Sequence, residues 1–272
     1  MYVVGVDGSR QSQAALRWAV DAAAARADEV VAVRVWSGLA PRLRASREGR
    51  ARAEGEEAAL AESVRPAVAA HPGMRPLRTE LREGDAATEL FRVAGDSGVI
   101  VVGRSGFSGR EATVMGSVVR QCVSRAQRPV VVVPDGDPAP PRGRVAVGVA
   151  DESHALRAVE WAAAEAAARD ATLVAVHAYA PSLVADAALE QLYEWELTHR
   201  VVDKALAAAG VAVDVEYAVH EEDTVRALLD AATGADLLVV GARTHGVLAN
   251  VVATTAIRCA ERSPVPVAVV PA

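Results

Sequence analysis

The sequence is poor in the residues that several common classes of protein require. Its 272 residues include only two cysteines, Cys122 and Cys259, too few for a disulfide framework or a structural zinc site. No apolar run reaches the ~18 residues needed to span a bilayer. The first residues lack the basic and apolar segments of a secretion signal. We therefore expect a cytoplasmic protein without a membrane segment.

Lysine is almost absent, and the chain carries a net negative charge. Lys204 is the single lysine among 29 basic residues, and it lies in a segment of helical pattern. A classical phosphate-binding loop requires Gly-Lys-Ser/Thr, so P-loop enzymes are excluded. The net charge of −6 argues against a dedicated nucleic-acid binder, which needs a concentrated basic face. The 51% hydrophobic and 24% charged composition is that of a globular chain.

What the chain does contain is an internal repeat. Val4-Gly5-Val6 and the helical-period segment 14–19 recur 143 residues later, as Val147-Gly148-Val149 and 157–162. Such self-similarity predicts two copies of one folding unit.

The boundary between the copies follows from proline and glycine. Each half closes with a valine-rich run that ends in proline, at 129–134 and at 266–271. The stretch 135–143 is rich in proline and glycine, so it cannot continue a helix or join a central strand. We predict two domains, 1–134 and 144–272, joined by a linker at 135–143.

Within each half, valine-rich runs alternate with alanine-rich segments of helical period. Runs such as Val99-Ile100-Val101-Val102 are apolar on both faces, which is typical of a parallel sheet covered by helices on both sides. The fold class is therefore α/β, with two tandem doubly wound parallel sheets. The predicted strands are 2–7, 30–36, 76–82, 99–103 and 130–133 in the first half, and 144–149, 172–178, 212–218, 236–240 and 267–270 in the second. The predicted helices of the first half are 12–27, 47–70, 86–95 and 117–126.

The candidate binding residues follow the first and fourth strands, because ligands of open α/β sheets bind outside the carboxyl ends of the strands. Asp7-Gly8-Ser9 follows the first strand, Gly103-Arg104-Ser105-Gly106 follows the fourth, and Gly116-Ser117 opens the next helix. Glycines allow backbone N–H groups to approach phosphate oxygens, and a helix N-terminus attracts anions. The same residues also fit ordinary turn and N-cap chemistry.

The spacing Gly-x2-Gly-x9-Gly-Ser/Thr, met by Gly103, Gly106, Gly116 and Ser117, resembles the ATP-binding subgroup of the universal stress proteins. The segments 4–9, 83–85 and 129–134 are also similar to that family. The resemblance covers essentially the whole chain, as a tandem pair. It implies five-stranded sheets of the adenine nucleotide alpha hydrolase-like type, with strand order 3-2-1-4-5.

By this resemblance, ATP, with or without Mg²⁺, is the expected ligand. Asp7 would contact the adenosine and Val35 would line the adenine pocket, while the glycines and hydroxyls hold ribose and phosphates. The family often reads Gly-Ser-Arg/His-Gly, whereas Arg104 precedes Ser105 here, so either side chain could be the one that reaches the ligand. The implied binding residues are Asp7, Gly8, Ser9, Val35, Gly103, Ser105, Gly106, Gly116, Ser117 and Val118. No catalytic residue and no metal ligand is predicted.

The second half lacks most of the motif. Ala150 stands in the place of Asp7, Thr244 in that of Gly106, and Thr254 in that of Gly116. Alanine cannot accept a side-chain hydrogen bond, and threonine has a branched Cβ where bare backbone is needed. The second domain is therefore predicted to be a copy that does not bind nucleotide.

The leading functional hypothesis is an ATP-binding stress-response protein that acts as a nucleotide-dependent sensor or regulator. A slow adenine-nucleotide hydrolase or adenylyl-transfer enzyme is one alternative, so enzymatic activity stays open. An interaction module without nucleotide is another. The family also implies that the closing strands pair the two domains as an internal pseudo-dimer. We also expect whole chains to form homo-oligomers. Neither nucleic acid nor membrane is an expected partner.

Overall fold

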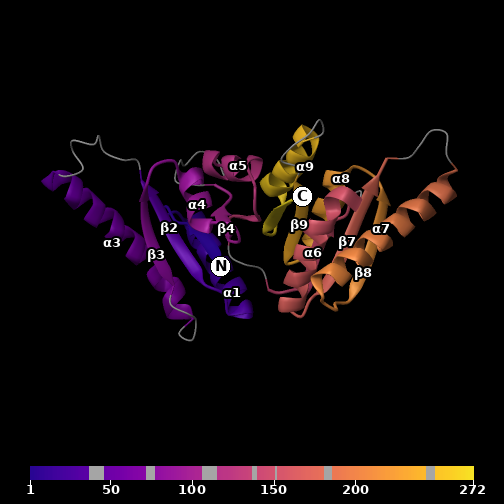
Figure 1. Cartoon of the computed structure of the whole chain (residues 1–272), viewed down its shortest axis with the longest axis horizontal. Coiled ribbons are helices and arrows are strands. Elements are labelled where there is room, and N and C mark those ends of the chain that lie inside the picture. Colours follow the sequence, from indigo (N-terminus) through magenta and orange to yellow (C-terminus); the bar gives the residue numbers. More distant parts are fainter. Residues whose placement is uncertain are drawn as a thin grey trace. The chain divides into compact units, whose positions relative to one another are not determined.

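The computed structural model describes residues 1–36, 46–71, 77–105, 115–136, 140–150, 152–180, 186–242 and 249–272. The chain divides into two compact units. One comprises Met1–Cys122 and Val130–Pro138, and the other comprises Val123–Pro129 and Ala139–Ala272. Each unit is built around its own parallel sheet (Figure 1). The domain limits predicted from the linker, and the predicted pairing of the closing strands, stay predictions.

The first unit has five strands whose backbone pairs are all parallel. The pairing gives the order β3-β2-β1-β4-β5, as predicted for a doubly wound sheet. In the central register, Val3 lies between Val31 and Ile100, and all three side chains are fully buried. The strands are β1 (Tyr2–Gly5), β2 (Val30–Trp36), β3 (Arg78–Glu83), β4 (Val99–Gly103) and β5 (Val130–Val133).

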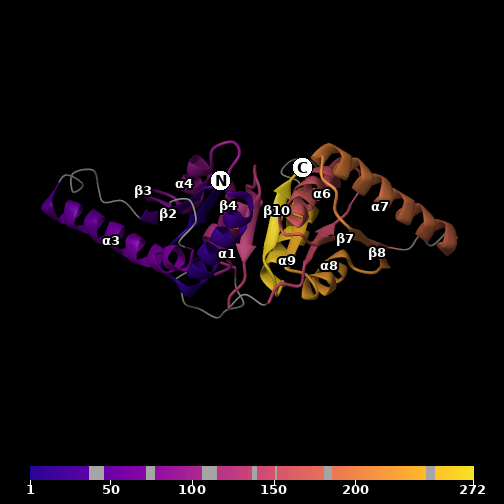
Figure 2. The ribbon, with the colours of Figure 1, turned by 90° about the horizontal axis from the view of Figure 1, so that it is seen from below.

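Helices cover both faces of this sheet (Figures 1 and 2). They are α1 (Arg10–Arg26), α3 (Arg47–Ala70), α4 (Ala86–Ala94) and α5 (Ser117–Ser124). The alternation of side chains along β2 separates the faces, since Arg34 pairs with Glu56 of α3 at 2.6 Å while Val33 and Val35 point to the side of α4. The site described below lies on the α4 side.

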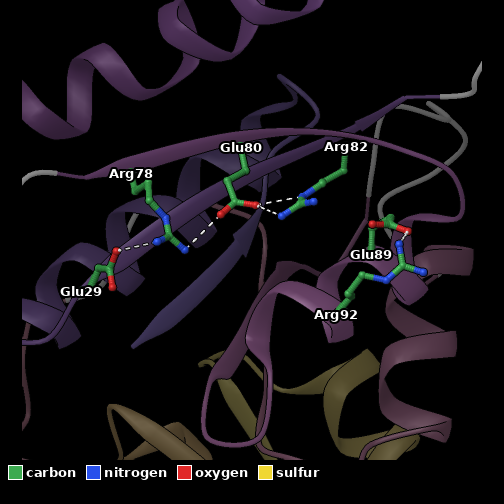
Figure 3. A network of polar contacts seen from close by, with 6 residues as sticks. All are labelled: Glu29, Arg78, Glu80, Arg82, Glu89 and Arg92. Carbon is green, nitrogen blue, oxygen red and sulfur yellow. Dashed lines mark hydrogen bonds and ion pairs between the residues drawn. The ribbon is translucent and has the colours of Figure 1, made fainter.

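The outer strand β3 carries alternating charges (Figure 3). Arg78 contacts Glu29 at 3.6 Å and Glu80 at 3.0 Å, and the Nε of Arg82 donates to Glu80 at 2.9 Å. These ion pairs line β3, which lies at the edge of the sheet and pairs with β2. Charged side chains on such an edge hinder pairing with another chain, which explains why this strand is not apolar like the others.

The second unit repeats the arrangement, with order β8-β7-β6-β9-β10 and parallel pairs throughout. Its strands are β6 (Arg144–Gly148), β7 (Thr172–Tyr179), β8 (Val215–Glu221), β9 (Leu237–Ala242) and β10 (Val267–Pro271). Its helices are α6 (Glu152–Ala168), α7 (Ala187–Ala209), α8 (Thr224–Thr233) and α9 (Ala249–Arg262). Among the described helices of both units, none has the length and apolar character needed to cross a bilayer.

One strand lies three residues later than predicted. The sequence pattern placed a strand at 212–218, whereas β8 is Val215–Glu221. Gly210 ends α7 in the left-handed conformation, and pairing with β7 begins where the Leu173 N–H donates to the Asp214 carbonyl. The apolar residues 211–213 therefore form the connection rather than the strand.

Candidate functional site

The carboxyl ends of β1, β2 and β4 surround a cavity of about 290 Å³. This volume is at the lower limit of small-molecule sites, which span about 300–1,000 Å³. Eight of the ten predicted binding residues lie on its wall: Asp7, Ser9, Val35, Gly103, Ser105, Gly116, Ser117 and Val118. Gly8 is not on the wall, and Gly106 lies outside the described residues.

Part of the cavity wall is apolar. Val33 and Val35 are two residues apart on β2, so both side chains point to the same face of the sheet. Leu90 of α4 and Val102 of β4 also line the cavity. Branched aliphatic side chains that converge from a sheet and a helix form a slot suited to a flat aromatic ring.

The start of α5 forms another part of the wall, at Ser117, Val118 and Val119. The first N–H groups of an α-helix have no carbonyl partner within the helix, and the helix dipole adds positive potential there. The wall therefore combines apolar side chains with a helix N-terminus suited to an anion.

Gly116 directly precedes α5, as its place in the sequence predicts, and its backbone groups are used within the first unit. Its N–H donates to the Arg104 carbonyl at 3.0 Å, and its own carbonyl accepts from the Arg120 N–H at 3.0 Å. Gly116 is thus the N-cap of α5, and its N–H is already used. The anion-facing donors of α5 begin at Ser117.

Gly103 is required by packing inside the first unit. A Cβ built on Gly103 would lie 2.6 Å from both the carbonyl carbon and the carbonyl oxygen of Gln11 in α1. Real Cβ atoms do not approach backbone so closely. The missing Cβ therefore makes room for a helix of the same unit, while Gly103 also lies on the cavity wall, where close approach of a phosphate stays a prediction.

Asp7 is exposed at the rim of the cavity. Its Oδ1 accepts a hydrogen bond from the Ser9 N–H at 2.9 Å, and the intervening Gly8 has φ +89°, a conformation that favours glycine. Ser9 is buried, and its Oγ accepts from the Ser12 N–H at 3.1 Å as the N-cap of α1. The turn thus fixes a carboxylate at the mouth of the cavity.

The structure also distinguishes Arg104 from Ser105. Ser105 lies on the cavity wall, and its Oγ donates to the Asp135 carboxylate at 3.3 Å. The guanidinium of Arg104 lies 3.9 Å from the same carboxylate. The prolines and glycines around Asp135 predict that it lies in the linker, whereas its carboxylate lies beside the site. The sequence did offer a signal, because Asp135 comes just after the closing strand and ligand sites lie beyond the carboxyl ends of such strands.

The equivalent positions of the second unit differ. Ala150 and Thr254 are both exposed, and Thr244 lies outside the described residues. Thr254 lies inside α9, which begins at Ala249, whereas Gly116 directly precedes α5. The helix N-terminus that faces the cavity in the first unit therefore has no counterpart at Thr254.

Other residues that could carry chemistry have structural roles. His177 of β7 is buried between the Val149 carbonyl, 2.7 Å from Nδ1, and the Glu194 carboxylate, 3.0 Å from Nε2. Cys122 and Cys259 are buried, and burial raises the pKa of the Cys259 thiol to about 12. Within the described parts of the chain, no group of three or more metal-binding side chains is found.

Comparison with known proteins agrees with this architecture. The model of the universal stress protein family matches residues 2–134 and again residues 141–271. The chain belongs to the universal stress protein family. It is 28% identical to the family member Rv2005c of Mycobacterium tuberculosis, over 98% of this chain and 96% of that one. It is 27% identical to Rv2623 of the same organism, over 90% and 86%.

The fold of a whole tandem member is also similar. A universal stress protein from Archaeoglobus fulgidus is 20% identical, with a TM-score of 0.73 over 99% of this chain and 97% of that chain. At this identity the likeness concerns the fold. The family and the two-domain organisation are thus established, and the residues of the site require their own argument.

Proposed function

We propose that the first domain binds ATP in the cavity at the carboxyl ends of β1, β2 and β4. The observation that carries the proposal is the chemical polarity of this cavity. Its wall combines apolar side chains such as Val35 and Leu90 with the N-terminus of α5, and the exposed carboxylate of Asp7 lies on the same wall. The apolar side chains suit the adenine base, the helix N-terminus suits a phosphate, and the carboxylate suits a hydroxyl of the sugar.

Each part of the nucleotide has a surface that suits it. The adenine ring would lie against Val33 and Val35, and the ribose hydroxyls would donate to Asp7. The phosphates would accept hydrogen bonds from the first N–H groups of α5 and from the Ser117 hydroxyl. Asp7 belongs with the sugar because a carboxylate repels phosphate.

We further propose that ATP occupancy is a regulatory signal in a stress response, and that the protein is not a fast enzyme. Whether Mg²⁺ accompanies the nucleotide is part of the test. Calorimetric titration of the full chain with ATP, with and without Mg²⁺, measures binding, and product analysis after incubation with Mg-ATP measures turnover. A saturable signal for ATP supports the proposal, and no binding at millimolar ATP would contradict it.

A variant that fills the slot tests the pose. Val35→Phe adds a ring to the apolar part of the wall, so we expect ATP affinity to fall by about tenfold or more as the base loses its place. Val68→Phe is the matched control, because it adds the same ring at an exposed position of α3 that is not on the cavity wall. If the Val35 variant binds as tightly as the wild type, the adenine does not lie in this slot.

A further inference from the structure

A carboxylate lies beside the part of the cavity wall that suits an anion. Asp135 is the second residue after β5. Both of its oxygens lie 3.3 Å from the Ser105 Oγ, which donates to them, and Oδ2 lies 3.9 Å from the Arg104 guanidinium. The side chains of Arg104 and Asp135 are 16% and 21% exposed, so water screens these charges less than at an open surface.

The backbone holds this charged cluster of Arg104, Ser105 and Asp135 against the start of α5. The Arg104 N–H donates to the Val133 carbonyl at 2.8 Å, and the Arg104 carbonyl accepts from the Gly116 N–H at 3.0 Å. Residue 104 thus joins the end of β5 to the N-terminus of α5, and Ser105 comes next on the cavity wall. The carboxylate of Asp135 is therefore close to the groups that we propose to hold the phosphates.

The contacts of Asp135 are longer than those of a tight charged pair. A hydroxyl that donates to a carboxylate usually lies about 2.5–2.7 Å from it, and a guanidinium nitrogen about 2.7–2.9 Å. A phosphate carries more negative charge than a carboxylate, and hydroxyl and guanidinium groups bind both. A phosphate in the cavity and the Asp135 carboxylate would therefore compete for the same two partners.

The second unit shows that the fold does not require this cluster. When β9 is aligned with β4 and β10 with β5, Ala242 stands in the place of Arg104 and Ala272 in that of Asp135. The Ala272 N–H donates to the Ala242 carbonyl at 3.1 Å, so the backbone closes there without a charged side chain at either position. Because the charges occur in the copy that has the nucleotide motif, they point to a role toward the ligand rather than in folding.

We propose that Asp135 is a specificity-determining residue, which weakens the binding of phosphates by competing with them for Ser105 and Arg104. This proposal rests on the proposed function, since it concerns the same cavity. The ligand must take both partners from the carboxylate, whose charge also repels it. The effect grows with the negative charge of the ligand, so a nucleoside is unaffected and a triphosphate is affected most. Asp135 thus makes occupancy of the site depend on the charge of the nucleotide.

The test variant is Asp135→Asn, which removes the charge but keeps the shape and an oxygen that can accept from Ser105. The matched control is Asp96→Asn, which makes the same change of net charge in the same unit. Asp96 is exposed between α4 and β4, at the amino ends of the strands and so far from the cavity. Calorimetry measures the affinity of the full-length wild type and of both variants for adenosine, AMP and ATP, first without Mg²⁺.

We expect Asp135→Asn to bind ATP about tenfold more tightly than the wild type, AMP with a smaller gain, and adenosine within about twofold of the wild type. Asp96→Asn should stay within about twofold for all three ligands. An equal gain for adenosine and ATP would overturn the proposal, since the variant would then have changed the cavity and not its charge. Unchanged ATP affinity would overturn it and leave the proposed function standing.

Mg²⁺ provides a second readout. The cation binds to the phosphates of ATP and neutralises part of their charge, so the gain from Asp135→Asn should be smaller for Mg-ATP than for ATP. Weaker binding of Mg-ATP by the variant than by the wild type would overturn the proposal, because Asp135 would then hold the cation. If neither protein binds ATP, this proposal and the proposed function fail together.

Discussion

The glycines of this chain are needed for different physical reasons, and the reason is clearest at Gly103. Its missing Cβ leaves room for the Gln11 backbone of α1. We expect Gly103→Ala to lower the free energy of unfolding by about 1–3 kcal/mol, the usual cost of overpacking a core. Urea unfolding followed by circular dichroism measures the change.

The control for this prediction is another glycine of the same unit. Gly55 lies in the middle of α3, and a Cβ there would meet no atom within 4 Å. Gly55→Ala should stabilise the protein by about 0.5–1 kcal/mol, because alanine loses less entropy in a helix. Two alanine variants with the same stability would contradict the packing role of Gly103.

Cys259 links stability to alkaline pH. Burial raises the pKa of its thiol from 9 to about 12, and Arg258 only partly offsets the effect. Because the folded state keeps the proton to higher pH than the unfolded state, the stabilisation is complete below pH 9. It is lost as the pH rises from 9 toward 12, by about 1.4 kcal/mol per unit.

The measurement compares the wild type with Cys259→Ala, which lacks this thiol. Between pH 9 and pH 10 the difference in unfolding free energy between the two proteins should shift by about 1 kcal/mol, with the wild type losing more. A difference that stays constant over this range would show that the thiol titrates alike in both states.

At the scale of elements, the start of α5 is the part of the site most open to a direct test. Gly116 is the N-cap of α5 and lies on the cavity wall. Gly116→Val would place a branched side chain at the N-terminus of α5, so we expect ATP affinity to fall by about tens to hundreds of times. Calorimetry measures the loss, and circular dichroism checks that the fold persists.

Valine is also a poor N-cap, so the control must remove a cap without touching the cavity. Asp223 is the N-cap of α8 in the second unit, where its side chain accepts from the Arg226 N–H. Asp223→Ala should weaken that helix by about 1 kcal/mol and leave ATP affinity unchanged. Unchanged affinity in the folded Gly116 variant would show that this glycine only starts a helix.

Most elements could be predicted from the sequence because a buried parallel strand has a strong pattern. Valine runs such as Val99–Val102 and the prolines that end β5 mark the strands within a few residues. The prediction for β8 was displaced because the apolar residues 211–213 resemble a strand while serving as a connection. Hydrophobic periodicity indicates which residues are buried, but it does not indicate which backbone N–H pairs with which carbonyl.

The site could be predicted as a set of residues but not as a set of contacts. The predicted strand ends bring Asp7 and Ser117 to one cavity, because the carboxyl ends of parallel strands share one sheet edge. Val35, which the family resemblance implied, lines the same cavity. It could not show that the Gly116 N–H is used by Arg104, nor that Asp135 lies beside Ser105. Such contacts depend on the path of the connections, which carries no periodic signal.

At the scale of the whole molecule, the asymmetry of the repeats predicts that each chain binds one ATP, in the first domain. The second domain has Ala150 where the first has the carboxylate of Asp7, and an alanine side chain offers a ribose hydroxyl no acceptor. Thr254 lies within α9, and its N–H is directed along the helix rather than toward a ligand. Each lost hydrogen bond costs about 1 kcal/mol, and an acceptor and an anion-binding helix end are lost together.

Calorimetric titration of the intact chain should therefore give a stoichiometry near one. Gly116→Val should remove the whole signal rather than half of it, since no second site of similar affinity remains. Thr254→Gly serves as the matched change in the second domain and should leave stoichiometry and affinity as they are. A stoichiometry near two, or a residual half signal in the Gly116 variant, would show that the second domain binds nucleotide by residues other than those equivalent to the first. In that case the two copies would differ in their contacts while sharing one function.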